Sequence, residues 1–138
     1  MRKTVLISGN FDPFHYAHLD YIRQAAKLGD QLICVVSSDK QVMKKKGKVN
    51  EPEEERAQLL CEILKGCLGC PFIVLINQWD KNTTLVAEAL KAVRPTIFCR
   101  GTDKILVDMP SEEMVVCREC GIQIVHVQGK IAHGSNFG

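Results

Sequence analysis

Two histidines lie three residues apart just after the first apolar run of the chain. His15 and His18 stand in SGNFDPFHYAH, residues 8–18, behind a turn that contains Gly9 and Asp12. Residues at i and i+3 share one helix face, so both imidazoles would project together near the first turn of a helix. Backbone N–H groups at such a turn attract anions. Two imidazole donors there suit phosphate oxygens and can stabilise the charge that builds during phosphate transfer.

The same pair of histidines has two plainer explanations, which are packing in the core and binding of a metal. A zinc site needs three or four ligands, and only Asp12 is a further candidate nearby. Gly9 favours the anion site, because glycine lets the backbone turn tightly and approach a ligand closely. We therefore predict an anion site and no metal held by protein ligands.

Apolar runs alternate with helical patterns along the whole chain. Short runs predict strands at residues 4–8, 31–38, 71–76, 96–100 and 122–127. Apolar residues at helical spacing, together with residues that typically begin or end helices, predict helices over 18–29, 51–66, 82–93 (with Asn82 as N-cap) and 110–121. The lysine-rich stretch 44–48 is assigned to the connection after the second strand. This alternation predicts an α/β fold: one Rossmann-like, doubly wound, parallel five-stranded sheet of order 3-2-1-4-5, forming a single domain over residues 1–138.

The predicted topology brings two distant segments together. In open parallel sheets, ligands bind beyond the carboxyl ends of the strands, where the strand order reverses. With order 3-2-1-4-5 that point lies between the first and fourth strands. These strands end in the histidine segment and in CRGTDK, residues 99–104. We therefore expect the imidazoles and the turn near Arg100 to face each other across one cleft.

Composition and charge exclude several classes of protein. The chain has 138 residues, of which 25% are charged, with a net charge of +2, too small to indicate a nucleic-acid or membrane partner. No apolar run reaches the roughly 20 residues that a membrane-spanning helix needs. The first residues, MRKTVLISG, lack the long apolar region of a signal peptide. These observations predict a cytoplasmic protein.

Seven cysteines include two CxxC pairs, CLGC at 67–70 and CREC at 117–120. Such pairs usually indicate zinc. Here each pair precedes a strand at one edge of the predicted sheet, and the two edges are about 19 Å apart at the usual strand spacing. This separation favours reduced, packed thiols, while a zinc site between subunits and a zinc-organised interaction module stay open as alternatives.

The segment GNFDPFHYAH resembles the nucleotidyltransferase superfamily that carries an HxGH motif, written HYAH here. The similarity continues in AAKLGDQLICVVSSD, EERAQLL and RPTIFCRGTDK, which resemble the heptose-1-phosphate adenylyltransferase and glycerol-3-phosphate cytidylyltransferase branches. The resemblance implies transfer of a nucleotidyl group from ATP or CTP to a phosphorylated sugar or polyol, with release of pyrophosphate. It also implies Mg²⁺ as cofactor and, by analogy with relatives that are often dimers, a homodimer.

The resemblance implies a role for each matching residue. His15 and His18 would contact the triphosphate and stabilise the transition state, and Lys46, or in second place Lys44, would hold phosphate. The nucleotide would also contact Gly9, Asn10, Phe11, Arg100, Gly101, Asp103 and Ser135. The acceptor side would involve Asp12, as an orienting residue for the acceptor or the metal, and Arg56, reaching the acceptor phosphate. The plainer alternatives are a solvated lysine loop, an exposed helix arginine and a surface turn.

The sequence departs from the superfamily pattern in two places. Ala17 replaces the glycine of HxGH, and the late serine/threonine motif is reduced to Ser135 in HGSNFG. These departures support a rival hypothesis, a non-catalytic nucleotide-binding or regulatory domain. Trp79 and Asp80, after the third strand, either cap the acceptor pocket or form an exposed loop. The base, the acceptor and the oligomeric state stay open.

Overall fold

The computed structural model describes residues 2–101 and 109–127. Ten elements follow one another along the chain. They are β1 (Thr4–Gly9), α1 (Tyr16–Ala26), β2 (Gln31–Val36), α2 (Asp39–Lys46), α3 (Glu53–Cys67), β3 (Phe72–Ile76), α4 (Ala87–Val93), β4 (Ile97–Gly101), α5 (Ser111–Cys120) and β5 (Gln123–Val127).

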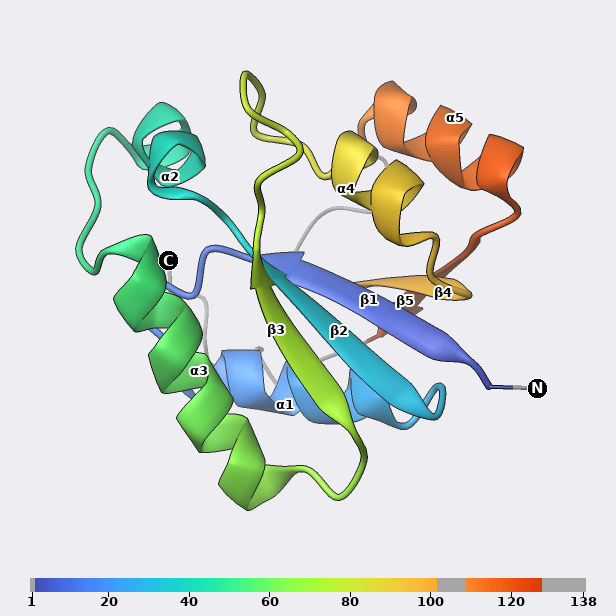
Figure 1. Ribbon diagram of the computed structural model, residues 1–138, viewed down its shortest axis with the longest axis horizontal. Helices are drawn as coiled ribbons and strands as arrows, with labels where there is room; N and C mark the ends of the chain where they lie inside the picture. The colour runs from blue at the N-terminus through green and yellow to red at the C-terminus, as the bar shows by residue number, and fades with distance from the viewer. Residues whose placement is uncertain (1, 102–108, 128–138) are drawn as a thin grey trace.

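The five strands form one parallel sheet in the order β3-β2-β1-β4-β5 (Figure 1). The predicted fold class and strand order are therefore confirmed. β1 pairs with β2 over six residues, from Thr4–Gln31 to Gly9–Val36. Its pairing with β4 covers only Val5–Ile97 and Leu6–Phe98 among the described residues. The two central strands thus part towards their carboxyl ends, at the point where the strand order reverses.

Helices cover both faces of the sheet. α1 and α3 lie on one face, and α4 and α5 lie on the other (Figure 1). Alternate strand residues enter two separate cores, so Val5 and Ile7 pack under α1 and α3 while Leu6 packs under α4 and α5. Burial on both faces explains why the inner strands β1, β2 and β4 are continuous apolar runs in the sequence.

Three of the lysines, at positions 44–46, lie in the helix α2, so the assignment of the lysine-rich stretch to a simple connection is wrong. Ser38 caps α2, since its side chain accepts a hydrogen bond from the N–H of Gln41, whose own side chain accepts one from the Ser38 N–H. This reciprocal capping box satisfies two donors that a helix start leaves unpaired. Gly47 then ends the helix with φ at 81°, a left-handed conformation that favours glycine.

The helix predicted over 82–93 begins later than expected, and Asn82 is not its cap. α4 starts after Val86, and the N–H groups at its start donate to side chains outside the helix. Asp80 accepts hydrogen bonds from the N–H groups of Glu88 at 2.8 Å and Ala89 at 3.1 Å, and Glu113 of α5 accepts one from Val86 at 3.0 Å. Capping by residues outside the helix is invisible to a local pattern.

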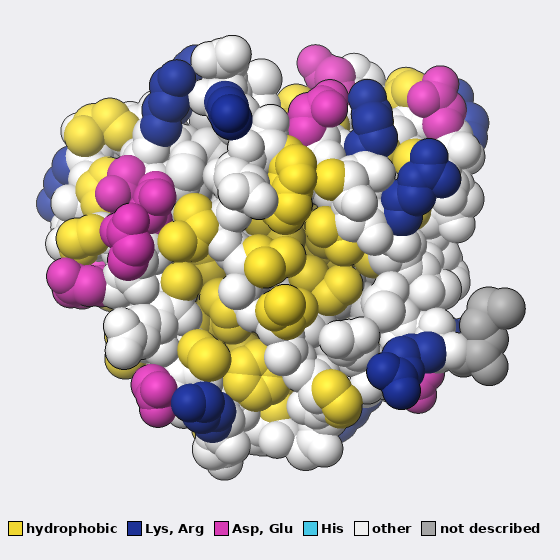
Figure 2. Space-filling view, viewed as in Figure 1, with side chains coloured by type: hydrophobic (Ala, Val, Ile, Leu, Met, Phe, Trp, Pro, Cys, Tyr) yellow, Lys and Arg dark blue, Asp and Glu magenta, His cyan; other side chains and the backbone are white. Residues whose placement is uncertain are grey.

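Apolar side chains gather on one face of the molecule, over β3 and the adjoining part of the sheet (Figure 2). β3 is an edge strand, and Ile73, its second residue, is 44% exposed. None of the helices in the described ranges is both long enough and apolar enough to cross a membrane.

All seven cysteines are free, with Cys34, Cys99 and Cys117 buried. The CxxC pairs precede β3 and β5, which lie at opposite edges of the sheet, as the predicted strand order requires. Burial raises the pKa of Cys34 and of Cys99 to about 12, so these two thiols stay protonated near neutral pH.

Candidate active site

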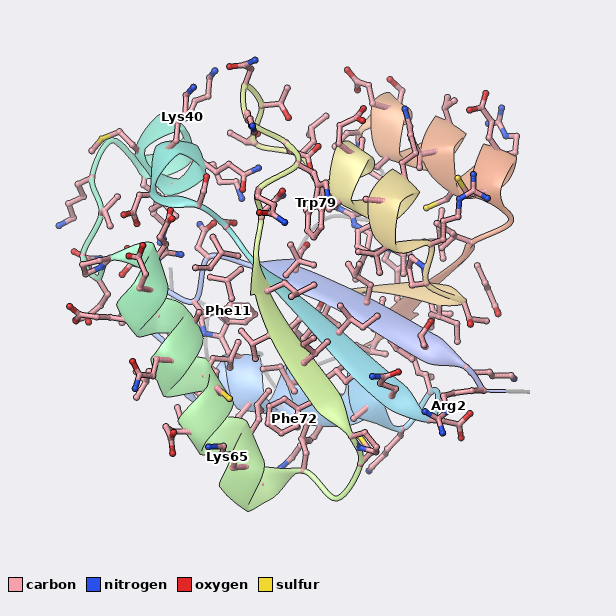
Figure 3. The ribbon with its side chains drawn as sticks, in the orientation of Figure 1. Arg2, Phe11, Lys40, Lys65, Phe72 and Trp79 are labelled. Atoms are coloured by element: carbon pink, nitrogen blue, oxygen red, sulfur yellow. The ribbon has the colours of Figure 1, made fainter. Side chains whose placement is uncertain are left out.

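The loop between β1 and α1 is built around Gly9 and Phe11. A Cβ atom on Gly9 would lie 2.9 Å from the ring atom Cζ of Phe11, so only glycine leaves room for this ring. Phe11 itself has a φ of 50°, which is unusual for a non-glycine residue, and its side chain is 3% exposed. Figure 3 shows the ring between α3 and the sheet. The buried ring therefore fixes a strained backbone turn at the carboxyl end of β1, a pattern that is frequent at functional sites.

The two imidazoles lie face to face at the start of α1. Their ring centroids are 4.0 Å apart with 14° between the planes. His15 occupies the N-cap position, and its backbone N–H donates to Nδ1 of His18 at 3.2 Å. Because Nδ1 of His18 accepts this bond, the proton of the neutral ring is on Nε2. His18 therefore presents an N–H donor on the side away from the backbone.

The surroundings of His18 keep it neutral. Phe11 and Phe14 lie against its ring, with centroids at 5.1 and 5.5 Å. Burial, followed by the nearby charges of His15 and Lys46, lowers the pKa of His18 from 6.5 to about 4. At neutral pH the residue is therefore a hydrogen-bond donor that needs no added proton.

Asp12 supports the loop instead of facing a ligand. Its two carboxylate oxygens accept hydrogen bonds from the N–H groups of Asn50 and Glu51, both at 2.8 Å. The residue is 2% exposed. Its oxygens are thus already engaged with the segment that leads into α3, which does not suit the predicted role of orienting an acceptor or a metal.

Arg56 of α3 joins three segments under the site. Its Nη1 donates to the carbonyls of Asn10 at 2.9 Å and Ser37 at 2.8 Å, and its Nη2 pairs with Asp39 at 2.8 Å. Its Nε donates to the carbonyl of Glu51 at 2.8 Å. With 2% exposure, Arg56 is not an exposed helix arginine, and it offers no accessible face to an acceptor phosphate. The structure gives it a positioning role beneath the β1 loop.

The lysines of α2 divide into two groups. Lys46 donates to the carbonyl of Asp12 at 3.2 Å, and Lys45 donates to the side chains of Asn10 at 3.1 Å and Ser37 at 3.4 Å. Both ammonium groups thus lie on the loop that precedes the histidines. Lys44 instead donates to the carbonyl of Asn82 at 2.9 Å, in the loop before α4.

Lys45 is a candidate site residue that the sequence interpretation missed. The signal was present, because Ser38, Gln41 and Gly47 mark the two ends of a helix around the lysine run. A helix separates neighbouring side chains by about 100°. Recognising the helix would therefore have shown that the three lysines point in different directions.

The carboxyl end of β4 forms the other side of the site. Because β1 and β4 are parallel neighbours, Asn10, which follows β1, and Gly101, the last residue of β4, lie at the same edge of the sheet. Tyr21 of α1 spans the two strands, since its hydroxyl donates to the carbonyl of Cys99 at 2.7 Å. The two strand ends therefore share one edge of the sheet, as the predicted strand order requires, while the facing of the imidazoles and the Arg100 turn across one cleft stays a prediction. Asp103 and Ser135 lie outside the described residues.

Trp79 and Asp80 lie on the α4 and α5 side of the sheet. Asp80 is 4% exposed and caps α4, while Trp79 is half-buried against the core beneath α4 (Figure 3). Neither residue is an exposed loop residue. Trp79 also lines a cavity of about 640 Å³ between the loop 79–85, α4 and α5. A role of Trp79 in capping the acceptor pocket stays a prediction.

Comparison with known proteins identifies the family. The family model described as cytidylyltransferase-like matches residues 6–132. The chain belongs to the cytidylyltransferase-like family. A bifunctional protein HldE of Campylobacter jejuni subsp. doylei is 32% identical over 135 residues, covering 94% of this chain and 28% of that protein. An FAD synthase of Pyrococcus horikoshii is 31% identical over 102 residues, covering 72% of this chain and 63% of that protein.

This cytidylyltransferase-like chain therefore spans about a quarter of the HldE relative and under two thirds of the FAD synthase. A solved structure titled as a lipopolysaccharide core biosynthesis protein from Thermoplasma volcanium has a TM-score of 0.68 at 23% identity. It covers 94% of this chain and 98% of its own, which supports the fold. The superfamily predicted from GNFDPFHYAH is thus confirmed.

Proposed function

We propose that this chain transfers a nucleotidyl group from ATP or CTP to a phosphorylated sugar or polyol, of the heptose-1-phosphate or glycerol-3-phosphate kind. The observation that carries the proposal is the pair of stacked imidazoles at the start of α1, with the neutral His18 donating through Nε2. Lys45 and Lys46 bring two positive charges to the same loop. This combination of the neutral His18 donor, two cations and a helix N-terminus suits a triphosphate.

In the proposed reaction an oxygen of the acceptor phosphate attacks the α-phosphorus. The new P–O bond forms as the bond between the α-phosphorus and the bridging oxygen breaks, and pyrophosphate leaves with that electron pair. His18 donates a hydrogen bond to the phosphate oxygens as their charge grows, and keeps its own proton. No side-chain nucleophile is required, because positioning and charge stabilisation supply the catalysis.

Magnesium belongs to the proposal as part of the substrate. Across the described residues, no group of three or more His, Cys, Asp or Glu could hold a metal ion. Asp12 does not fit as a ligand, because both its oxygens accept backbone hydrogen bonds and it is 2% exposed. Mg²⁺ usually takes few protein ligands beside nucleotide phosphates. We expect turnover to stop when EDTA exceeds Mg²⁺, as measured by pyrophosphate release.

The test of the proposed function is pyrophosphate release from ATP or CTP across a panel of phosphorylated acceptors. We expect turnover with at least one sugar or polyol phosphate and none with the unphosphorylated compound. Nucleotide binding without turnover for any acceptor would instead favour the non-catalytic domain. That rival draws support from Ala17, a buried residue where the HxGH motif has glycine. A homodimer stays a proposal, tested by sedimentation equilibrium against the 15.4 kDa of one chain.

A further inference from the structure

Two polar side chains lie side by side at the carboxyl end of the sheet, away from the histidines. Arg100 of β4 and His126 of β5 are partners in the strand pairing. Partners in parallel strands project on the same face of a sheet. Two residues earlier, Phe98 and Ile124 pack into the core beneath α4 and α5. Arg100 and His126 therefore project on the α4 and α5 side of the sheet.

Both side chains carry a buried polar atom that lacks a partner. Within residues 2–101 and 109–127, neither Nη1 of Arg100 nor Nε2 of His126 has a hydrogen-bond partner. Nearly all buried polar atoms in folded proteins are paired, because leaving one unpaired costs free energy. Two such atoms on adjacent strands indicate a position that a ligand's polar groups complete.

Glu113 of α5 lies near this position, close enough to interact electrostatically with Arg100. One oxygen of its carboxylate accepts the N–H of Val86 at 3.0 Å. Burial raises the pKa of Glu113, while the nearby charges of Arg100 and Lys45 act in the lowering direction. Lys45 also contacts Asn10 in the β1 loop at 3.1 Å. Lys45 therefore lies near both Glu113 and the β1 loop, which places Arg100, Glu113 and His126 at the same edge of the sheet as the lysines of α2.

The two parts of this sheet edge differ in charge. The β1 and α2 end combines two lysines with a helix N-terminus, so it favours an anion. At the β4 and β5 end, the carboxyl group of Glu113 adds hydrogen-bond acceptors near the guanidinium of Arg100, and His126 adds a polar ring nitrogen. Such a balanced set of donors and acceptors suits an uncharged group with its own donors and acceptors. In a nucleoside triphosphate that group is the base.

We propose that His126, together with Arg100, reads the hydrogen-bonding edge of the nucleobase, which makes His126 a specificity-determining residue. This inference rests on the proposed function, since it assumes a nucleotide substrate. The physical basis is that a site built to hydrogen-bond a group rejects analogues that leave its buried polar atoms unpaired.

The test compares His126→Leu and His126→Gln with wild type by isothermal titration calorimetry. The probes are ATP, CTP, GTP, UTP and inorganic tripolyphosphate, which has no base. We expect the wild type to prefer one nucleotide, and His126→Leu to lower that preference by about tenfold or more. Its affinity for tripolyphosphate should change by less than about twofold, since the phosphate contacts are elsewhere. The His126→Gln variant should restore part of the preference, because the amide nitrogen of glutamine reaches close to the place of Nε2.

The control is Gln123→Ala, an exposed change on the same strand, which should leave every affinity unaltered. Cooperative urea unfolding checks that each variant is folded. The inference is overturned if His126→Leu keeps the wild-type preference, if it weakens tripolyphosphate as much as the nucleotides, or if the wild type binds all four nucleotides equally. A wild type that binds no nucleotide would overturn the proposed function, and this inference with it.

Discussion

At the scale of single residues, the chemistry of the site depends on the environment of His18 more than on its presence. Its ring packs between Phe11, Phe14 and His15, and its Nδ1 accepts the backbone N–H of His15. This environment fixes both the charge and the tautomer of the ring. A free histidine titrates near pH 6.5 and has no fixed tautomer.

His18→Ala should lower turnover by about 10²–10³-fold, the usual loss when one donor to a developing charge is removed. The fold should persist, because His18 is only partly buried and its ring contacts only the margin of the core, at Phe11 and Phe14. Steady-state pyrophosphate release measures the loss, and circular dichroism checks the helix content. Turnover equal to that of the wild type would mean that the active site lies elsewhere.

The depressed pKa of His18 should make stability depend on pH. Its pKa is 6.5 unfolded and about 4 folded, so between these values the unfolded chain binds more protons. The free energy of unfolding should therefore fall as the pH drops from 6.5 towards 4. Urea unfolding at several pH values measures the slope, and His18→Gln should make it shallower. An identical slope in wild type and variant would contradict the proposed environment of His18.

At the scale of elements, α2 and α3 hold the β1 loop in place. α2 directs Lys45 and Lys46 to the loop and Lys44 away from it. α3 supplies Arg56, which binds the carbonyl of Asn10 from 46 residues further along the chain. The position of the loop is thus set by two helices that follow it in the sequence and are not its neighbours there.

The lysines of α2 should differ in their effect on substrate binding. Lys45→Ala and Lys46→Ala should each raise the Michaelis constant for the nucleotide by about tenfold, as expected when one charge-assisted contact to phosphate is lost. Lys44→Ala is the matched control on the same helix and should stay within about twofold. If Lys44→Ala raised the Michaelis constant as much as the other two substitutions, the division of the α2 lysines into two groups would be wrong.

Arg56→Met should destabilise the fold by about 2–4 kcal/mol, because it leaves buried carbonyls without their donor. Lys65→Met is the control on the same helix, since Lys65 pairs with Glu62 at the surface with 62% of its side chain exposed. That change should cost less than about 1 kcal/mol. If chemical denaturation showed the same loss in the free energy of unfolding for Arg56→Met and Lys65→Met, the buried contacts of Arg56 would not contribute to stability as argued.

At the scale of the whole molecule, β1 and β4 part towards their carboxyl ends, which is where a parallel sheet of this order is expected to bind a ligand. In a parallel sheet, all the loops that lead from a strand into a helix lie at the same edge. Where the strand order reverses, successive helices cover opposite faces of the sheet, and a crevice is left between their loops. A ligand there touches segments from both halves of the chain, so binding should stabilise the entire fold.

A nucleoside triphosphate at about 100 times its dissociation constant should stabilise the fold by about 2.7 kcal/mol. For a domain of this size, that corresponds to a rise in melting temperature of roughly 5–10 °C. Differential scanning fluorimetry with ATP and CTP measures the shift, and the nucleosides without phosphates are the control. Equal shifts with nucleoside and triphosphate would argue against the phosphate site at α1.

Local patterns in the sequence predicted the architecture well. Apolar runs located all five strands, and their alternation with helices predicted the order β3-β2-β1-β4-β5. The helix α5 was found from Pro110 and Gly121, which act within one turn of its ends. Prediction failed for the start of α4, which is capped by Asp80 and by Glu113, 27 residues away from Val86.

The sequence by itself therefore determined the fold, the family and the histidine pair, because strand periodicity and a motif of adjacent residues are local properties. Only the tertiary structure decided that His18 is neutral, that Arg56 is buried under the loop, and that Lys45 joins the site. Charge state, burial and side-chain partners depend on segments distant in the chain. Their contacts exist only once the sheet has brought those segments together.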